Sequence, residues 1–234
     1  MSTDLRYDAL IVDHDDTSVM STPCIHYPAH LEALKQLRPG REPIDLAGWF
    51  LKNQDPGLMG YLVGELGFSR EELAMNHAIW RSYTTSRVPV FFPGFIETMV
   101  DFRKHGGCII VISHSEEVII ARDYRAAAMT GPSFFPDAIY GWTDEPELRK
   151  PSPRPLLSAM GHFRLDPERV LVLDDLKPGV DMAAAAGVDC AAAGWGHDIP
   201  EIRDAMRSIC MSYFTRIDDF SEYLLKITRD RPLH

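Results

Sequence analysis

A chain of 234 residues can bury one large hydrophobic core, or a core and a small second unit. Its 34 acidic and 24 basic side chains give a net charge of −10, which disfavours nucleic acid and anionic membranes as partners without excluding a local basic patch. The four cysteines are scattered without a CxxC pair, the amino terminus has no apolar signal segment, and no apolar run approaches the roughly 20 residues that span a bilayer. We therefore expect a cytoplasmic protein with reduced thiols.

Short apolar runs between polar turns predict strands that are buried on both faces of a parallel sheet. These runs, of which the third is the weakest, are residues 9–12, 108–112, 138–142, 170–173 and 190–193. Helical patterns separate them, at 95–104, after an N-capping Ser152 with Pro153 in the first position, and at 180–186 before Gly187. This alternation predicts a right-handed α/β sandwich.

The stretch between the first two strands is too long for a single crossover and predicts an inserted all-helical module. Its helical segments are 29–37, 44–52, 58–66 and one that begins with a capping box of Ser69 and Glu72. Four aromatic residues are expected to form the core of this module: Trp49, Phe50, Trp80 and Tyr83. Polar residues of the module are candidates for the cleft, with no basis for choosing among them: His26, Lys52, Asn53 and Arg81.

Two groups of aspartates follow predicted strands. In an extended segment Asp13 and Asp15 project to the same side, and the pair Asp174 and Asp175 ends the fourth strand in a similar way. Open α/β sheets bind ligands at the carboxyl ends of their strands. If the two strands are neighbours, four carboxylates converge and require protons or a cation. Oxygen ligands of this kind suit Mg²⁺.

Two aspartates at a spacing of two also suit covalent phosphoryl transfer, because one can attack phosphorus while the other moves protons. The phosphoryl group needs donors and positive charge around its oxygens. Ser113, which ends the second predicted strand, and Lys150, which precedes the helix after Ser152, are candidates for that role. Ser115 is expected to cap the helix that follows it.

Four ordered motifs, DHDDT, an apolar run ending in Ser113, LRKPSP and LDDLKPGVDMAAAAGV, resemble those of the haloacid dehalogenase superfamily. The resemblance implies a Rossmann-like three-layer α/β/α core with a parallel sheet, formed by residues 1–19 and 92–234, and a C1-type helical cap formed by 20–91. It implies the following roles: Asp13 as nucleophile, Asp15 as general acid/base, Ser113 and Lys150 as phosphate ligands, and Mg²⁺ held by Asp13, the Asp15 carbonyl, Asp174 and Asp175, with Asp175 favoured for direct contact.

Three positions refine this interpretation. Dehalogenating members usually lack the second aspartate of the first motif, so Asp15 disfavours a dehalogenase. Asp16 stands where the family commonly has glycine, which brings the local turn into question. His114 stands where an amide or a small polar residue is more familiar; we include it in the phosphate-binding set, although its role is open. His14 is expected to pack beside the first strand.

The expected function is Mg²⁺-dependent hydrolysis of a phosphomonoester, with a small phosphorylated metabolite as substrate and an aspartyl-phosphate intermediate. Two alternatives stay open: a phosphomutase with the same nucleophile, and a binding protein for phosphorylated metabolites that has lost turnover. The identity of the substrate and the oligomeric state cannot be read from the sequence.

Overall fold

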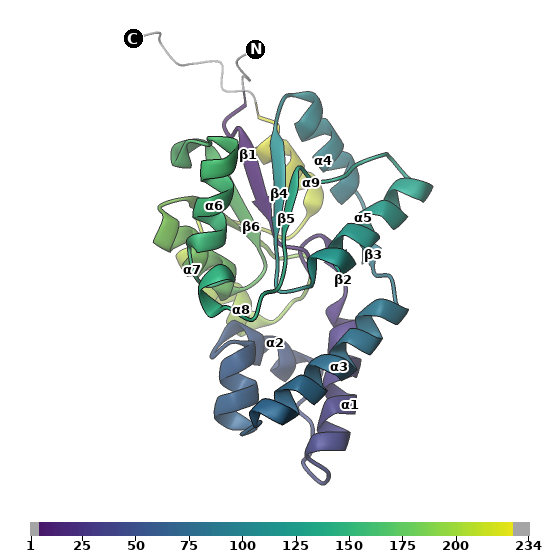
Figure 1. Cartoon of the computed structure of the whole chain (residues 1–234). Coiled ribbons are helices and arrows are strands. Elements are labelled where there is room, and N and C mark those ends of the chain that lie inside the picture. The colour runs from purple at the N-terminus through teal and green to yellow at the C-terminus, as the bar shows by residue number, and fades with distance from the viewer. Residues whose placement is uncertain (1–4, 227–234) are drawn as a thin grey trace.

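A six-stranded parallel sheet forms the centre of the computed structural model, which describes residues 5–226 (Figure 1). The strands lie in the order β5-β4-β1-β6-β7-β8. Their bounds are β1 Ala9–Val12, β4 Cys108–Ile112, β5 Ala138–Tyr140, β6 Val170–Asp174, β7 Asp189–Ala193 and β8 Ser212–Phe214. The sequence predicts the first five. The short edge strand β8 escapes prediction because its three half-buried residues form no continuous apolar run.

Helices cover both faces of this sheet and produce three layers. The side chains of β1 alternate, so that Leu10 and Val12 join the hydrophobic cluster of one face while Ala9 and Ile11 join that of the other. The helices of the first face are α4 Phe95–Lys104, α5 Glu117–Thr130 and α9 Ile217–Leu224. Those of the second are α6 Arg154–Phe163, α7 Lys177–Ala186 and α8 Pro200–Ile209. The predicted α/β class with a parallel sheet is confirmed.

A helical unit, here called the cap, is inserted between two short strands, β2 (Val19–Met20) and β3 (Val90–Phe91), which pair antiparallel. Its elements are η1 Thr22–His26, α1 Tyr27–Leu37, α2 Leu46–Gln54, η2 Gly60–Glu65 and α3 Arg70–Ser86. The predicted capping box at the start of α3 is present. Figure 1 shows the cap beyond the carboxyl ends of the parallel strands, where a ligand of the sheet would lie.

The aromatic residues of the cap have different partners from those expected. Trp49 belongs to the hydrophobic cluster of the cap. The prediction for Phe50 is wrong, because its ring packs into the cluster of the sheet, with its centroid 4.7 Å from that of His197. Gln54, on the same helix, accepts a 2.7 Å hydrogen bond from the backbone N–H of Lys177. Helix α2 therefore docks the cap onto the α/β core.

Two helix starts differ from the sequence prediction. Helix α6 begins at Arg154 with Pro153 as its N-cap, one residue later than predicted from Ser152. Helix α5 has Glu116 as its N-cap, so Ser115 does not cap it. The hydroxyl of Ser115 donates instead to the carboxylate of Asp15, and a charged acceptor forms a stronger hydrogen bond than a neutral one.

Four cysteines form no disulfide in this structure: Cys24, Cys108, Cys190 and Cys210. Within residues 5–226, none of the helices combines the length and the apolar character that crossing a bilayer requires.

Candidate active site

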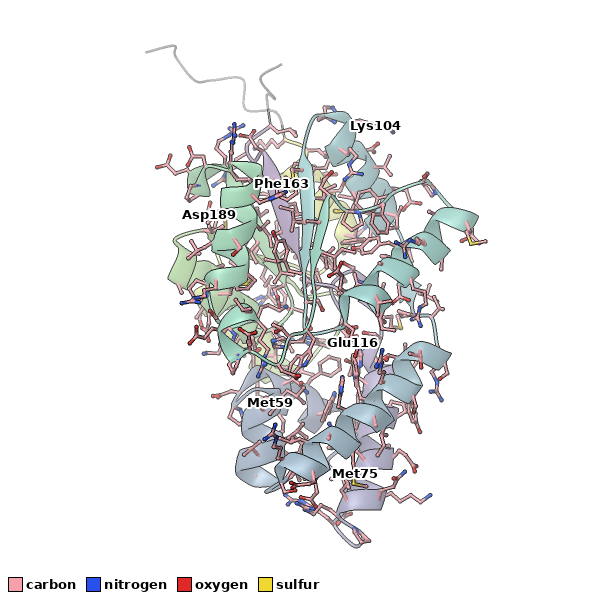
Figure 2. All side chains as sticks on the ribbon, in the orientation of Figure 1. Met59, Met75, Lys104, Glu116, Phe163 and Asp189 are labelled. Atoms are coloured by element: carbon pink, nitrogen blue, oxygen red, sulfur yellow. The ribbon has the colours of Figure 1, made fainter. Side chains whose placement is uncertain are left out.

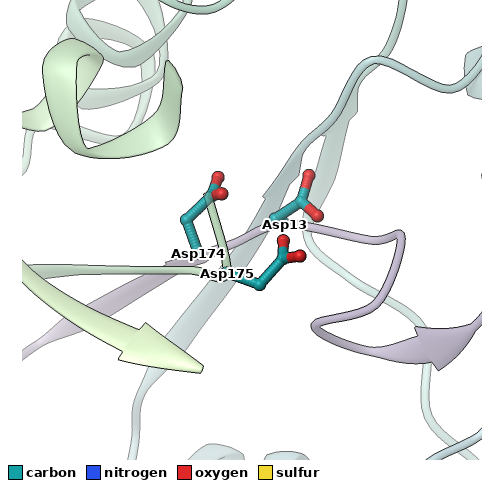
Figure 3. A group of neighbouring side chains, drawn as sticks. All are labelled: Asp13, Asp174 and Asp175. Carbon is teal, nitrogen blue, oxygen red and sulfur yellow. The ribbon is translucent and has the colours of Figure 1, made fainter. Parts of the chain in front are cut away.

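The pairing of β1 with β6 brings three carboxylates together at the carboxyl edge of the sheet. Val12 lies opposite Leu173, and the N–H of the next residue, Asp13, donates to the Leu173 carbonyl at 2.9 Å. Oxygen atoms of Asp13, Asp174 and Asp175 lie within 4.8 Å of one another (Figure 3). The sequence predicts four converging carboxylates, whereas this cluster contains three, because the carboxylate of Asp15 has other partners.

Lys150 reaches this cluster from the loop before α6. Its Nζ donates to Asp13 Oδ1 at 2.5 Å and to Asp174 Oδ2 at 2.7 Å, and its side chain is only 5% exposed. Burial alone would lower the pKa of Lys150, but Asp13 and Asp174 together raise it above its ordinary value. The ammonium is therefore a fixed positive charge between two strand ends, as an equatorial phosphoryl oxygen would require.

The three carboxylates carry more negative charge than Lys150 neutralises. Burial raises the pKa of Asp13 and of Asp175 well above the ordinary value, and repulsion among the carboxylates adds to the rise. Three carboxylates and one ammonium leave an excess of two negative charges. A divalent cation with a preference for oxygen neutralises that excess, so the donor set fits Mg²⁺.

Neighbouring residues hold Asp174, the last residue of β6, and Asp175, which follows it, in different ways. Asp174 uses both oxygens, one for Lys150 and one for the backbone N–H of Leu176. It lies so close to α7 that a Cβ at Gly179 would be 2.0 Å from its Oδ2. The side chain of Asp175 receives a 3.2 Å hydrogen bond from Thr17, and His197 Nε2 lies 3.4 Å from its second oxygen. Asp175 thus keeps more of its coordinating capacity for a cation.

Asp15 points to a second group of side chains. Its Oδ2 accepts from the Ser115 hydroxyl at 2.6 Å and from the Ser113 hydroxyl at 3.4 Å, and its Oδ1 contacts His26 Nε2 at 2.8 Å. Burial alone would raise the pKa of Asp15, but the charge and hydrogen bond of His26 lower it well below the ordinary value. Asp13 and Asp15 therefore have pKa values displaced in opposite directions.

His26 brings a cap side chain into direct contact with Asp15. Its other ring nitrogen, Nδ1, accepts a 2.9 Å hydrogen bond from the indole N–H of Trp80. Because an indole N–H only donates, the Nδ1 lone pair is occupied and the proton of the neutral ring lies on Nε2, facing Asp15. Burial alone would lower the pKa of His26, but the charge and hydrogen bond of Asp15 outweigh burial and raise it above its ordinary value. Sequence reasoning names His26 only among several polar cap residues, because its partner is 11 positions away across an interface.

His114 supports the backbone of Lys150. Its Nε2 lies 2.9 Å from the Lys150 carbonyl, and a carbonyl only accepts, so Nε2 donates. Burial, reinforced by the Lys150 charge, lowers the pKa of His114 to about 4. The neutral ring therefore has its single N–H committed to positioning the Lys150 loop.

The turn at Asp16 keeps the conformation that glycine would favour. Asp16 has φ of 58°, in the left-handed region that Asp tolerates. Its Oδ1 accepts from the backbone N–H of Thr22 at 3.2 Å. A Cβ at Gly196 would lie 2.1 Å from the Asp16 carbonyl oxygen, so Gly196 permits this close packing. Burial, with repulsion from Asp175, raises the pKa of Asp16 to about 7.

A cleft of about 630 Å³ opens between the cap and the core beside Glu116. Glu116 lies at this junction in Figure 2 and pairs across it with His77 at 3.2 Å and Arg81 at 3.4 Å, both from α3. Trp142 and Arg125 also line the cleft. This opening is lined by both the cap and the core, and its volume is sufficient for a small molecule.

Comparisons with known proteins give the family of this chain and its fold. A family model described as haloacid dehalogenase-like hydrolase matches residues 7–187. A phosphoglycolate phosphatase of Mesorhizobium japonicum is 27% identical over 136 residues, and the match spans only 58% of either chain.

Two solved structures have the same fold. A haloacid dehalogenase-like hydrolase of Bacteroides fragilis superposes with a TM-score of 0.76 at 22% identity, covering 92% of this chain and 99% of that one. A Lactobacillus plantarum protein assigned as a phosphoglycolate phosphatase gives 0.74 at 22% identity, with 93% and 99% coverage.

Proposed function

Because this chain belongs to the haloacid dehalogenase-like hydrolases and is therefore a hydrolytic enzyme, we propose that it is a Mg²⁺-dependent phosphomonoesterase of the cytoplasm that acts on a small phosphorylated metabolite. The observation that carries the proposal is the separation of two aspartates into different environments. Asp13 lies among carboxylates and Lys150, and Asp15 lies among hydroxyls and an imidazole. This separation suits a nucleophile and a proton-transfer group.

In the first proposed step, a carboxylate oxygen of Asp13 attacks phosphorus and the bond from phosphorus to the ester oxygen breaks. This step needs Asp15 as the carboxylic acid, the form that its contact with His26 disfavours, and the acid gives its proton to the leaving oxygen. Lys150, Ser113 and the backbone N–H of His114 are the proposed ligands of the phosphoryl oxygens. The products are the free alcohol and an aspartyl-phosphate on Asp13.

In the second step Asp15, now a carboxylate, removes a proton from water, and the water oxygen attacks phosphorus. The bond between phosphorus and Asp13 breaks, which releases inorganic phosphate and restores the carboxylate. The donors from His26 and Ser115 favour the ionised form of Asp15 that this step needs. Asp13, Asp174 and Asp175 with the Asp15 carbonyl would hold Mg²⁺, which supplies charge neutralisation to the phosphoryl group.

A screen of phosphorylated metabolites with Mg²⁺, scored by released phosphate, tests the proposal. 2-Phosphoglycolate comes first in the screen because a matched relative bears the name of that activity. We expect stoichiometric phosphate that carries ¹⁸O from labelled water, no activity in chelator, and none from Asp13→Asn. A phosphoenzyme that persists in water and discharges only to a sugar monophosphate would establish the phosphomutase alternative. Binding without turnover of any metabolite would establish the non-catalytic alternative.

A further inference from the structure

Arg122, on α5 of the core, holds the end of the last cap helix. Its Nη1 donates to the carbonyls of Thr84 at 2.6 Å and Thr85 at 3.3 Å, and its Nη2 donates to that of Arg87 at 2.8 Å. The last carbonyls of a helix have no partner within the helix, so this guanidinium supplies donors that α3 lacks at its C-terminal end. Figure 1 shows that end of α3 rising to meet α5.

Asp123, the next residue of α5, extends this contact to the catalytic loop. Its Oδ1 accepts from Arg122 Nη2 at 2.6 Å, and its Oδ2 lies 3.2 Å from Nε2 of His14. Asp123 and His14 are both 1% exposed. His14 stands between Asp13 and Asp15, and the sequence predicts only that it packs beside the first strand. A carboxylate only accepts, so the imidazole donates to it.

These contacts cross the hinge of the cap. The two connections between cap and core are β2 and β3, and residues 84–87 lie on the cap side of β3. The ring of His14 also packs against Phe91 of β3, with centroids 6.2 Å apart. A rotation of the cap about β2 and β3 would separate the α3 carbonyls from Arg122 while α5 and His14 stay with the core.

We propose that Arg122 and Asp123 are positioning residues that link closure of the cap to the placement of the Asp13–Asp15 loop. His14, Arg122 and Asp123 are called the hinge clamp below. In the closed cap Arg122 binds the carbonyl end of α3, and Asp123 holds His14 and therefore the loop that bears both aspartates. The catalytic part of this inference rests on the proposed function; the mechanical part does not.

Hydrogen exchange tests the mechanical part without any substrate. Arg122→Gln removes the guanidinium, and we expect amide exchange in residues 17–21 and 82–92 to rise by about tenfold or more. Arg103→Gln is a matched control, because Arg103 donates to the Phe135 carbonyl and pairs with Asp137 on the core without touching the cap. Exchange unchanged in Arg122→Gln, or raised equally by the control, would overturn the clamp. Should Arg122→Gln not fold, Arg122→Lys must show a smaller rise in the same two segments, since one ammonium cannot bridge all three carbonyls.

Kinetics test the catalytic part on the best substrate of the metabolite screen. We expect Arg122→Gln to lower kcat by about tenfold and leave the inhibition constant of inorganic phosphate within twofold, because the phosphate ligands are untouched. Arg122→Lys should recover part of kcat. Equal loss of kcat and phosphate affinity, as general unfolding produces, would refute a positioning role. If wild-type protein hydrolyses nothing, the proposed function fails, and the exchange experiment still decides the clamp.

Discussion

Replacing Asp175 by asparagine should stabilise the metal-free protein. Two unit charges 4.8 Å apart repel by about 3 kcal/mol at an effective dielectric constant of 20. Lys150 and partial protonation offset some of this repulsion, so we expect Asp175→Asn to raise the free energy of unfolding by about 1–3 kcal/mol in chelator at pH 8. For a chain of this size that corresponds to an increase in Tm of roughly 2–12 °C. Asparagine keeps the acceptor that Thr17 uses.

The stability gained by Asp175→Asn should depend on pH and on Mg²⁺. Because the folded-state pKa of Asp175 is raised, the folded protein binds a proton more readily than the unfolded chain, and wild-type stability falls as pH rises from about 4 through the raised pKa. The advantage of Asp175→Asn should therefore shrink as pH is lowered. Added Mg²⁺ at 100 times its Kd stabilises wild type by about 2.7 kcal/mol and should do much less for the variant.

Urea unfolding with and without Mg²⁺ checks these values. Asp181→Asn on α7 is the matched control: it makes the same chemical change at a side chain 42% exposed that pairs with Lys177, and it should change stability by less than about 0.5 kcal/mol. A variant less stable than wild type in chelator would refute the claim that the carboxylates repel one another. An equal gain from Mg²⁺ in variant and wild type would show that Asp175 does not hold the cation.

Three further predictions concern single contacts of the site. Asp13→Asn should lower kcat by several orders of magnitude without loss of the folded state, as seen by phosphate release and circular dichroism, whereas near-normal turnover would place the nucleophile elsewhere. Lys150→Met should destabilise the protein by about 3–5 kcal/mol in urea unfolding, because it leaves two buried carboxylates unpaired; a change under 1 kcal/mol would contradict that. Trp80→Phe should lower kcat about tenfold with the inhibition constant of phosphate unchanged, because only the orientation of His26 is lost; an unaltered kcat would remove Trp80 from the mechanism.

The strand ends of the site were predictable because they follow from local pattern. The apolar runs before Asp13 and Asp174 specify buried strands, and a parallel sheet aligns their carboxyl ends at one edge. The order of the four motifs also predicts the family, which the match to residues 7–187 confirms. The sequence pattern was therefore enough to predict that the site lies at the carboxyl edge of the sheet, and to identify the aspartates that end its strands.

The contacts across the cap interface were not predictable in the same way. His26 and Trp80 are 54 positions apart and meet only after the cap has folded, and no periodicity records that meeting. Phe50 is an aromatic residue within a cap helix, which predicts a place in the core of the cap. The side of α2 that carries it packs instead on the sheet. The sequence predicts Ser115 as a helix cap because capping rules consider only residues close to it in the chain. Its actual partner, Asp15, lies 100 positions away.

The contrast between Asp13 and Asp15 explains how one short loop can supply two different carboxylates. Asp13, the proposed nucleophile, lies among Asp174, Asp175 and Lys150, where burial and repulsion raise its pKa, so its ionised form is favoured only when further positive charge enters the cluster. Asp15, two residues away, is turned toward donors from the core and the cap that lower its pKa without a cation. A pair of groups with pKa values displaced in opposite directions can divide the roles of nucleophile and proton carrier. Because one of those donors, His26, belongs to the cap, we expect the protonation of Asp15 to respond to movement of the cap, whereas that of Asp13 should respond to the proposed cation.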